Sequence, residues 1–185
     1  KGDKLDLIIH SPGGSPTATE ALVAYIRSKF EDIRVIIPHA AMSAATMLAC
    51  SANSIVMGKH SFIGPIDPQM ILQTKLGATS VPAQAIIDQF RMAQKECQTS
   101  EQLNSWFPIL EQYGPALITQ CDNAIKLSEE LVSVWLSKYM FANKRDSKND
   151  QKVWQNISQI IGVSRRILVI LIGLRQKSED WSLKI

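Results

Sequence analysis

The sequence predicts an α/β protein with a parallel sheet and a helical C-terminal part. Two observations lead to this prediction. Short apolar runs rich in β-branched residues alternate with helical segments between Leu5 and Met57, and apolar residues recur at helical spacing from Val81 onward. Strands that alternate with helices form a parallel sheet through right-handed crossovers. The 185 residues, 45% of them apolar, suffice for one domain with a real core.

The predicted sheet region alternates strands and helices. The first strand ends in a turn rich in proline and glycine, and Thr17 or Thr19 can cap the helix that follows. A second helix consists of small residues and is expected to be buried. In chain order we predict a buried strand at 5–9, a helix ending at Phe30, a strand at 33–37, a helix at 40–52 and a strand at 54–57.

The chain changes character after Gly58. The segment 62–69 contains two prolines and is expected to be a loop. Three helices are then predicted, at 83–97, 106–113 and 116–141. We assign residues 1–143 to one domain and 144–185 to a polar linker with an atypical tail. Because polar residues lead from Lys1 straight into a strand, we expect the domain to be incomplete at its N-terminus.

Composition narrows the classes of function. The net charge of +3 is too small to indicate a nucleic-acid partner. Cys50, Cys97 and Cys121 have no metal-like or paired spacing, which predicts reduced thiols in a reducing, cytoplasmic compartment. The apolar run 167–174 is far shorter than the ~20 residues that span a bilayer. Membrane association through a missing N-terminal segment of a longer parent protein stays open.

A pair of glycines follows the first predicted strand, in Ser11-Pro12-Gly13-Gly14. Glycines at the C-terminal end of a strand leave backbone N–H groups that no side chain shields. Acyl-transfer chemistry needs such donors where a carbonyl oxygen becomes an oxyanion. Taken alone, the motif indicates an ordinary turn.

Ser43 stands among alanines at the predicted start of the second helix. A nucleophile there would gain from the free N–H groups and the dipole of the helix N-terminus. The small side chains of Ala44 and Ala45 would let a substrate backbone approach. The alternative is a serine that only permits tight packing, and taken alone the residue favours this alternative.

Four motifs occur together and in a specific order: HSPGGS at 10–15, AAMSAATML at 40–48, IVMG at 55–58 and GPIDPQ at 64–69. In this combination the chain resembles the serine dehydrogenase proteinase family. That family is related to signal-peptide peptidase A and to the Clp protease, on the Clp/crotonase fold. The resemblance runs from about Leu5 to about Phe141 and implies a Clp/crotonase-like spiral core with parallel strands and a helical C-terminal extension.

The resemblance also implies a reaction. Ser43 would be the nucleophile of peptide hydrolysis through an acyl-enzyme, without a metal or organic cofactor. The turn of Gly13 and Gly14, with Ala44, would form the oxyanion hole through the backbone N–H groups of Gly14 and Ala44. A substrate strand would pair along the edge beside Gly13 and Gly14. Peptide or protein substrates and a homo-oligomer are further expectations.

The sequence leaves the general base open. In the Clp protease a histidine follows the nucleophile, and the corresponding stretch here holds Ile66 and Asp67. Signal-peptide peptidase A uses a lysine further along, for which Lys75 and Lys95 are the candidates. We favour Lys75, which follows GPIDPQ closely, in a serine–lysine dyad. Asp67 could orient a base or a water, or could be a turn aspartate that satisfies its own loop.

Three histidines lie near the motifs. His10 and His39 end strands beside the two key motifs, and His60 follows the third strand. Strand-end histidines are usually structural, and we expect His60 to point away from Ser43.

The tail departs from the resemblance. The family carries a basic, histidine-containing C-terminal segment, which residues 152–185 lack. Reverse-translating Lys152 to Gly173 and reading two nucleotides later can give such a segment. We therefore consider a frameshift near Asp150, in which case the tail has no selected fold. Resequencing the gene and finding an uninterrupted frame would end this hypothesis.

Two other functions stay open. A non-proteolytic scaffold of the same fold would keep Ser43 without a competent base, and would not react with a serine-directed phosphonate. An acyl-CoA enzyme of the crotonase type would use a similar oxyanion hole without needing the serine. In that case Ser43→Ala would be as active as the wild type on an acyl-CoA.

Overall fold

The computed structural model describes residues 2–74 and 77–142. These residues form two compact units. The first holds the described residues up to Ile66 and those from Val132 on, and the second runs from Asp67 to Leu131. The candidate base Lys75, the predicted linker and the atypical tail lie outside the described residues.

The first unit is built on parallel strands. Its elements are β1 (Gly2–Ile8), α1 (Pro16–Lys29), β2 (Phe30–Ile37), β3 (Ala40–Ala41), α2 (Ala44–Cys50), β4 (Ser54–Met57) and β5 (Phe62–Ile63). The main sheet has the order β1-β2-β4, and a separate short ladder pairs β3 with β5. All these pairings are parallel. The predicted α/β class with a parallel sheet is confirmed.

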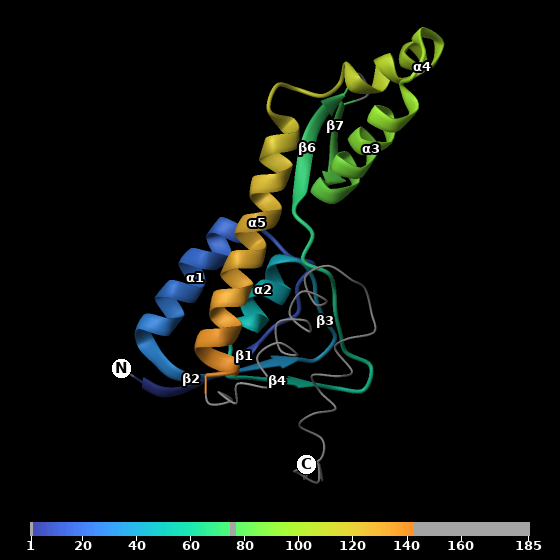
Figure 1. Cartoon of the computed structure of the whole chain (residues 1–185). Coiled ribbons are helices and arrows are strands. Elements are labelled where there is room, and N and C mark those ends of the chain that lie inside the picture. Colours follow the sequence, from blue (N-terminus) through green and yellow to red (C-terminus); the bar gives the residue numbers. More distant parts are fainter. Residues whose placement is uncertain (1, 75–76, 143–185) are drawn as a thin grey trace, which may run out of the picture. The chain divides into compact units, whose positions relative to one another are not determined.

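The main sheet buries one face. Figure 1 shows α1 and α2 on the same side of this sheet. The buried core lies there, and its members are Ile9, Ile33, Val35, Ile37, Ala41, Ala45, Ala49 and Ala52. On the other face Arg34 pairs with Asp6 in an exposed ion pair, and Ile8 is 69% exposed. The expectation of a buried first strand is therefore wrong, because β1 is exposed at alternate positions.

Ser15 caps α1, where the sequence had suggested Thr17 or Thr19. The Ser15 hydroxyl accepts a hydrogen bond from the Ala18 N–H at 3.3 Å, and Pro16 follows as the first helical residue. Proline suits this position because its missing N–H would have no partner in the helix. The Thr19 hydroxyl instead donates to the Ser15 carbonyl oxygen at 3.0 Å.

Arg27 on α1 connects distant segments of the first unit. Its guanidinium donates to the Ser51 carbonyl oxygen at 3.2 Å and to the Asn53 side chain at 2.8 Å. It also lies 3.7 Å from the ring centroid of Tyr139, within the range of a cation–π contact. Tyr139 belongs to a short π-helix, η1 (Leu136–Met140). Partial burial lowers the pKa of Arg27.

The second unit combines a hairpin with helices. Its elements are β6 (Gln69–Thr74), β7 (Gly77–Pro82), α3 (Ala83–Glu96), α4 (Ser100–Leu110) and α5 (Leu117–Trp135), whose last residues belong to the first unit. The strands β6 and β7 pair antiparallel. The core of this unit contains Ala83, Ile86, Ile87, Leu117 and Cys121. Among the described residues, no helix has both the length and the apolar character to cross a membrane.

The three predicted helices are present with shifted ends, and α4 differs most. It begins at Ser100, ahead of the predicted Trp106, because Thr99 and Gln102 form a capping box. In such a box the side chain of each residue bonds a free backbone N–H of the other.

Candidate functional site

Hydrogen bonds join the loop after β1 to β3. The Ser11 N–H donates to the Ala40 carbonyl oxygen at 3.1 Å, and the Met42 N–H donates to the Ser11 carbonyl oxygen at 3.0 Å. These bonds make a parallel bridge between Ser11 and Ala41. On the other side of β3, the Gly64 N–H donates to the Ala41 carbonyl oxygen at 2.8 Å. Three motifs that are distant in sequence therefore meet at β3.

Gly13 lies directly against Ser43. Its φ is +119°, a conformation open to glycine and strained for other residues. A Cβ atom at Gly13 would lie 3.0 Å from the Met42 carbonyl oxygen, 3.0 Å from the Ser43 Cβ and 3.5 Å from the Ala44 nitrogen. The turn needs glycine at this position both for its φ and for its close contact with the backbone around Ser43.

Ser43 has an unusual backbone conformation, with φ 49° and ψ −117°. Such a conformation costs on the order of 1–3 kcal/mol and persists only where the surroundings enforce it. Here the Ser43 N–H donates to the Pro65 carbonyl oxygen at 3.2 Å, and the Ser43 carbonyl oxygen accepts from the Met47 N–H at 3.1 Å. A sharp, strained turn between strand and helix is also how α/β-hydrolases expose their nucleophilic serine.

The backbone amides that directly follow Gly13 and Ser43 in the chain are free to donate. Within the described part of the chain, the N–H groups of Gly14 and Ala44 make no hydrogen bond. A Cβ at Gly14 would meet nothing within 4 Å, so the space around it is open. The Ser43 side chain does not cap α2. Because α2 has only seven residues, these two amides are a firmer basis for an oxyanion hole than the helix dipole.

The Thr46 side chain stabilises the turn around Ser43 through buried hydrogen bonds. Its side chain is buried, with 1% exposure. The hydroxyl lies 3.0 Å from the Ala41 carbonyl oxygen and 2.9 Å from the Gly64 carbonyl oxygen. One hydroxyl thus links α2 to β3 and to the residue that follows β5, three positions along the chain from Ser43.

Thr46→Val is expected to destabilise the protein by about 1–3 kcal/mol, because it leaves buried carbonyl oxygens without this donor. Urea unfolding followed by circular dichroism measures the change. Thr46→Ser keeps the hydroxyl and is the matched control, for which we expect the smaller loss. An equal loss in both variants would show that the methyl group of Thr46, and not its hydroxyl, stabilises the turn.

The described residues include no hydrogen-bond partner for the Ser43 hydroxyl. Asp67 belongs to the second unit, and partial burial raises the pKa of its carboxyl group. Lys75 lies outside the described residues, and Lys95 is exposed on α3.

Sequence reasoning missed the supporting residues Thr46, Gly64 and Pro65. Gly64 is buried, and a Cβ there would collide with the Met42 side chain. Its position in GPIDPQ was a signal for such a role, because glycine is required where two segments approach closely. The motif was assigned to a loop, which gave no reason to bring it beside Ser43.

The fold and the site together define a class of protein. An α/β core that holds a strained serine against a glycine turn shares these features with α/β serine hydrolases. The chain belongs to the ClpP-like SDH-type serine proteinases, whose family model matches residues 1–103 of the 185. Every candidate site residue lies within the matched range. The resemblance inferred from the motifs is confirmed.

The chain is also similar to two uncharacterized proteins of Methanocaldococcus jannaschii. One is 40% identical over 70 residues, which are 38% of this chain and 24% of the relative. The other is 42% identical over 66 residues, which are 36% of this chain and 23% of the relative. The aligned part thus spans about a quarter of the length of these relatives. No solved structure matches the chain.

Proposed function

We propose that the protein is a serine endopeptidase that cleaves peptide bonds through an acyl-enzyme on Ser43. The observation that carries the proposal is the strained backbone of Ser43, packed so closely against Gly13 that a Cβ atom at Gly13 would lie 3.0 Å from the Ser43 Cβ. Strain of this kind is concentrated at active sites, where it positions a reacting group in advance. Membership of the ClpP-like serine proteinases supports the same reaction.

In the proposed reaction the Ser43 hydroxyl attacks the carbonyl carbon of the scissile peptide bond while a base takes up its proton. The oxyanion that forms is stabilised by the N–H groups of Gly14 and Ala44. The bond to the leaving amine then breaks, and the amine receives the proton. Water hydrolyses the resulting ester and frees the serine. Lys75 and Asp67 are the proposed partners in proton transfer.

The wider proposals rest on the family. We propose that β1, β2, β4 and the short β3-β5 ladder form part of a Clp/crotonase-like spiral, and that the protein assembles with copies of itself. The thiols of Cys50, Cys97 and Cys121 are free, which supports a reducing, cytoplasmic location. Burial raises the pKa of Cys50 to about 12, as expected of an inert structural thiol.

Digestion of an unstructured protein such as casein tests the function. We expect the purified chain to release peptides that mass spectrometry detects, and Ser43→Ala to release none above background. Ser28→Ala is the matched control, because Ser28 is exposed on α1 and its hydroxyl donates to the Tyr25 carbonyl oxygen of the same helix. Cleavage that persists in Ser43→Ala would remove Ser43 from the mechanism.

A catalytically inactive scaffold of the same fold is the second candidate. It is favoured by the Ser43 hydroxyl, which has no hydrogen-bond partner among the described residues. Catalytic hydrogen bonds often tighten only when substrate binds, so this observation does not outweigh the strained backbone. A folded protein that neither cleaves casein nor reacts with a phosphonate would establish the scaffold.

A further inference from the structure

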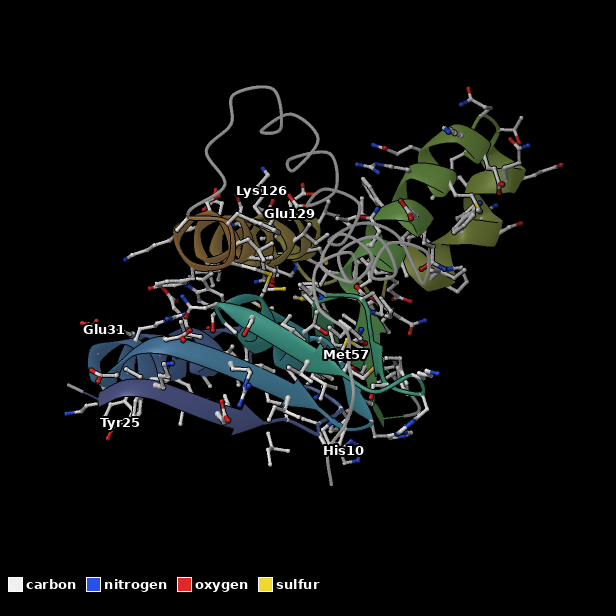
Figure 2. The ribbon with its side chains drawn as sticks, turned by 90° about the horizontal axis from the view of Figure 1, so that it is seen from below. His10, Tyr25, Glu31, Met57, Lys126 and Glu129 are labelled. Carbon is white, nitrogen blue, oxygen red and sulfur yellow. The ribbon has the colours of Figure 1, made fainter. Side chains whose placement is uncertain are left out.

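Two histidines face each other at the ends of neighbouring strands. His10 follows β1 and His39 follows β2, which pair in parallel. Their ring centroids are 5.3 Å apart, with the ring planes inclined by 58°, and both residues are exposed. Figure 2 shows His10 at the same end of the sheet as Met57, the end opposite Glu31. The candidate reaction uses neither ring.

Neighbouring groups hold His39 in place. Its ring meets the ring of Phe62 edge-on, at a centroid distance of 5.4 Å. Its carbonyl oxygen accepts a hydrogen bond from the Phe62 N–H at 2.9 Å. The preceding residue is also held, because the Pro38 carbonyl oxygen accepts a hydrogen bond from the Ser61 hydroxyl at 3.0 Å. A ring fixed in this way loses little further freedom when it binds a ligand.

We propose that His10 and His39 bind one Zn²⁺ ion. With Zn–N bonds of about 2.0–2.1 Å in tetrahedral geometry, the centroids of two imidazoles on one ion lie roughly 5 Å apart. The observed centroid distance of 5.3 Å matches this spacing. Imidazole is a preferred ligand of zinc, and also of copper and nickel.

Water would complete the coordination. Among the described residues, no group of three or more histidine, cysteine, aspartate or glutamate side chains could hold a metal ion. The site therefore offers two protein ligands and open positions, which is typical of a reversible site and not of a closed structural one. His60 serves as a comparison, because it is exposed in the turn after β4 and beside Gly58.

An ion bound by both His10 and His39 would stabilise the fold around the candidate site. His10 directly precedes Ser11, and His39 directly precedes Ala40. The Ser11 N–H donates a hydrogen bond to the Ala40 carbonyl oxygen at 3.1 Å. An ion on both rings would tie the loop that carries Gly13 to the strand that leads to Ser43. A ligand that binds only the folded state raises its stability, so zinc is expected to raise the melting temperature. This expectation does not depend on Ser43 being a nucleophile.

Calorimetric titration of the untagged, metal-free chain with ZnCl₂ tests the proposal. We expect one ion per chain, a rise in melting temperature, and at least tenfold weaker binding in both His10→Gln and His39→Gln. His60→Gln is the matched control and should bind as the wild type does. Co²⁺ provides a spectroscopic signature, because its absorption bands should appear in the wild type and be lost in the two site variants.

Protection from chemical modification tests the same pair without a substitution. In the wild type, zinc should slow the reaction of His10 and His39 with diethyl pyrocarbonate, measured by peptide mass spectrometry, and should leave His60 unaffected. The proposal is overturned if no stoichiometric binding occurs, if binding survives both site variants, or if zinc protects neither ring. The pair would then be an aromatic packing contact with Phe62.

Discussion

We expect Ser43→Ala to abolish covalent labelling of the protein by a fluorophosphonate probe, the largest effect that any single substitution here should have. The probe reacts with a serine whose hydroxyl is activated and whose tetrahedral adduct is stabilised by an oxyanion hole. Removing the nucleophile of a serine peptidase lowers turnover by roughly 10⁴–10⁶-fold. Labelling of the variant should therefore fall to the level of the denatured protein, as measured by gel fluorescence and intact mass.

The control separates loss of the nucleophile from loss of the fold. Ser28→Ala removes an exposed hydroxyl on α1 and should label as the wild type does. Replacing Ser43 by alanine also relieves no backbone strain, because alanine has the same preferences at φ 49°. The wild type and Ser43→Ala are therefore expected to have similar circular dichroism spectra. A wild type that does not label while folded would favour the scaffold, and would leave Ser43 as a residue that permits packing of α2.

The order of strands and helices in the first unit was predictable because local signals agree with the tertiary environment. The run at 33–37 is β-branched and ends at Pro38, and in the structure it is the central strand β2, with Val35 and Ile37 fully buried. The alanines after Ser43 predicted a buried helix, and α2 is buried at all but one position. Agreement of this kind between propensity and packing is typical of natural sequences.

The second unit was harder to predict. The hairpin of β6 and β7 escaped notice because β7, GATSVP, lacks apolar alternation and is mostly exposed. Its pairing with β6 is a property of the backbone and the turn, which periodicity does not reveal. The exposed face of β1 was missed for a related reason. A run of leucine and isoleucine looks the same in the sequence whether the strand is buried on one face of the sheet or on both.

For the site, the sequence predicted which residues matter but not how they meet. The Pro-Gly-Gly turn and Ser43 were singled out by their motifs. Their contact depends on the bridge between Ser11 and Ala41, a pairing across thirty positions of the chain that no local pattern encodes. The strained backbone of Ser43, whose N–H donates to the Pro65 carbonyl oxygen, likewise cannot be recognised in an alanine-rich segment. Local rules are expected to fail most often at functional sites.

Gly13→Ala is expected to cause a larger loss of stability than alanine at Gly77 or at Gly14. Alanine is strained at φ +119°, and its Cβ would approach the Met42 carbonyl oxygen and the Ser43 Cβ to 3.0 Å. Backbone strain costs about 1–3 kcal/mol, and forcing an extra carbon into a packed site adds about 1–3 kcal/mol. The total, roughly 2–6 kcal/mol, is measured by urea unfolding.

Substitutions at two other glycines separate the cost of backbone strain from the cost of close packing. Gly77 also has a positive φ, +112°, but a Cβ there would meet nothing within 4 Å. Gly77→Ala should therefore cost only the strain. Gly14 does not have a positive φ, and a Cβ atom there would meet nothing within 4 Å. Gly14→Ala should therefore change the free energy of unfolding by less than about 0.5 kcal/mol. Because Gly14→Ala keeps its N–H, it should also still label with the fluorophosphonate.

The order of the three variants decides whether the contact between the turn and Ser43 is real. If Gly13→Ala costs no more than Gly77→Ala, then the turn does not press against Met42 and Ser43, and the proposed oxyanion hole loses its geometry. If Gly13→Ala costs clearly more, the excess reports the close packing of Gly13 against Met42 and Ser43. Reduced labelling in the fraction of Gly13→Ala that remains folded would then show that this packing also sets the reactivity of the serine.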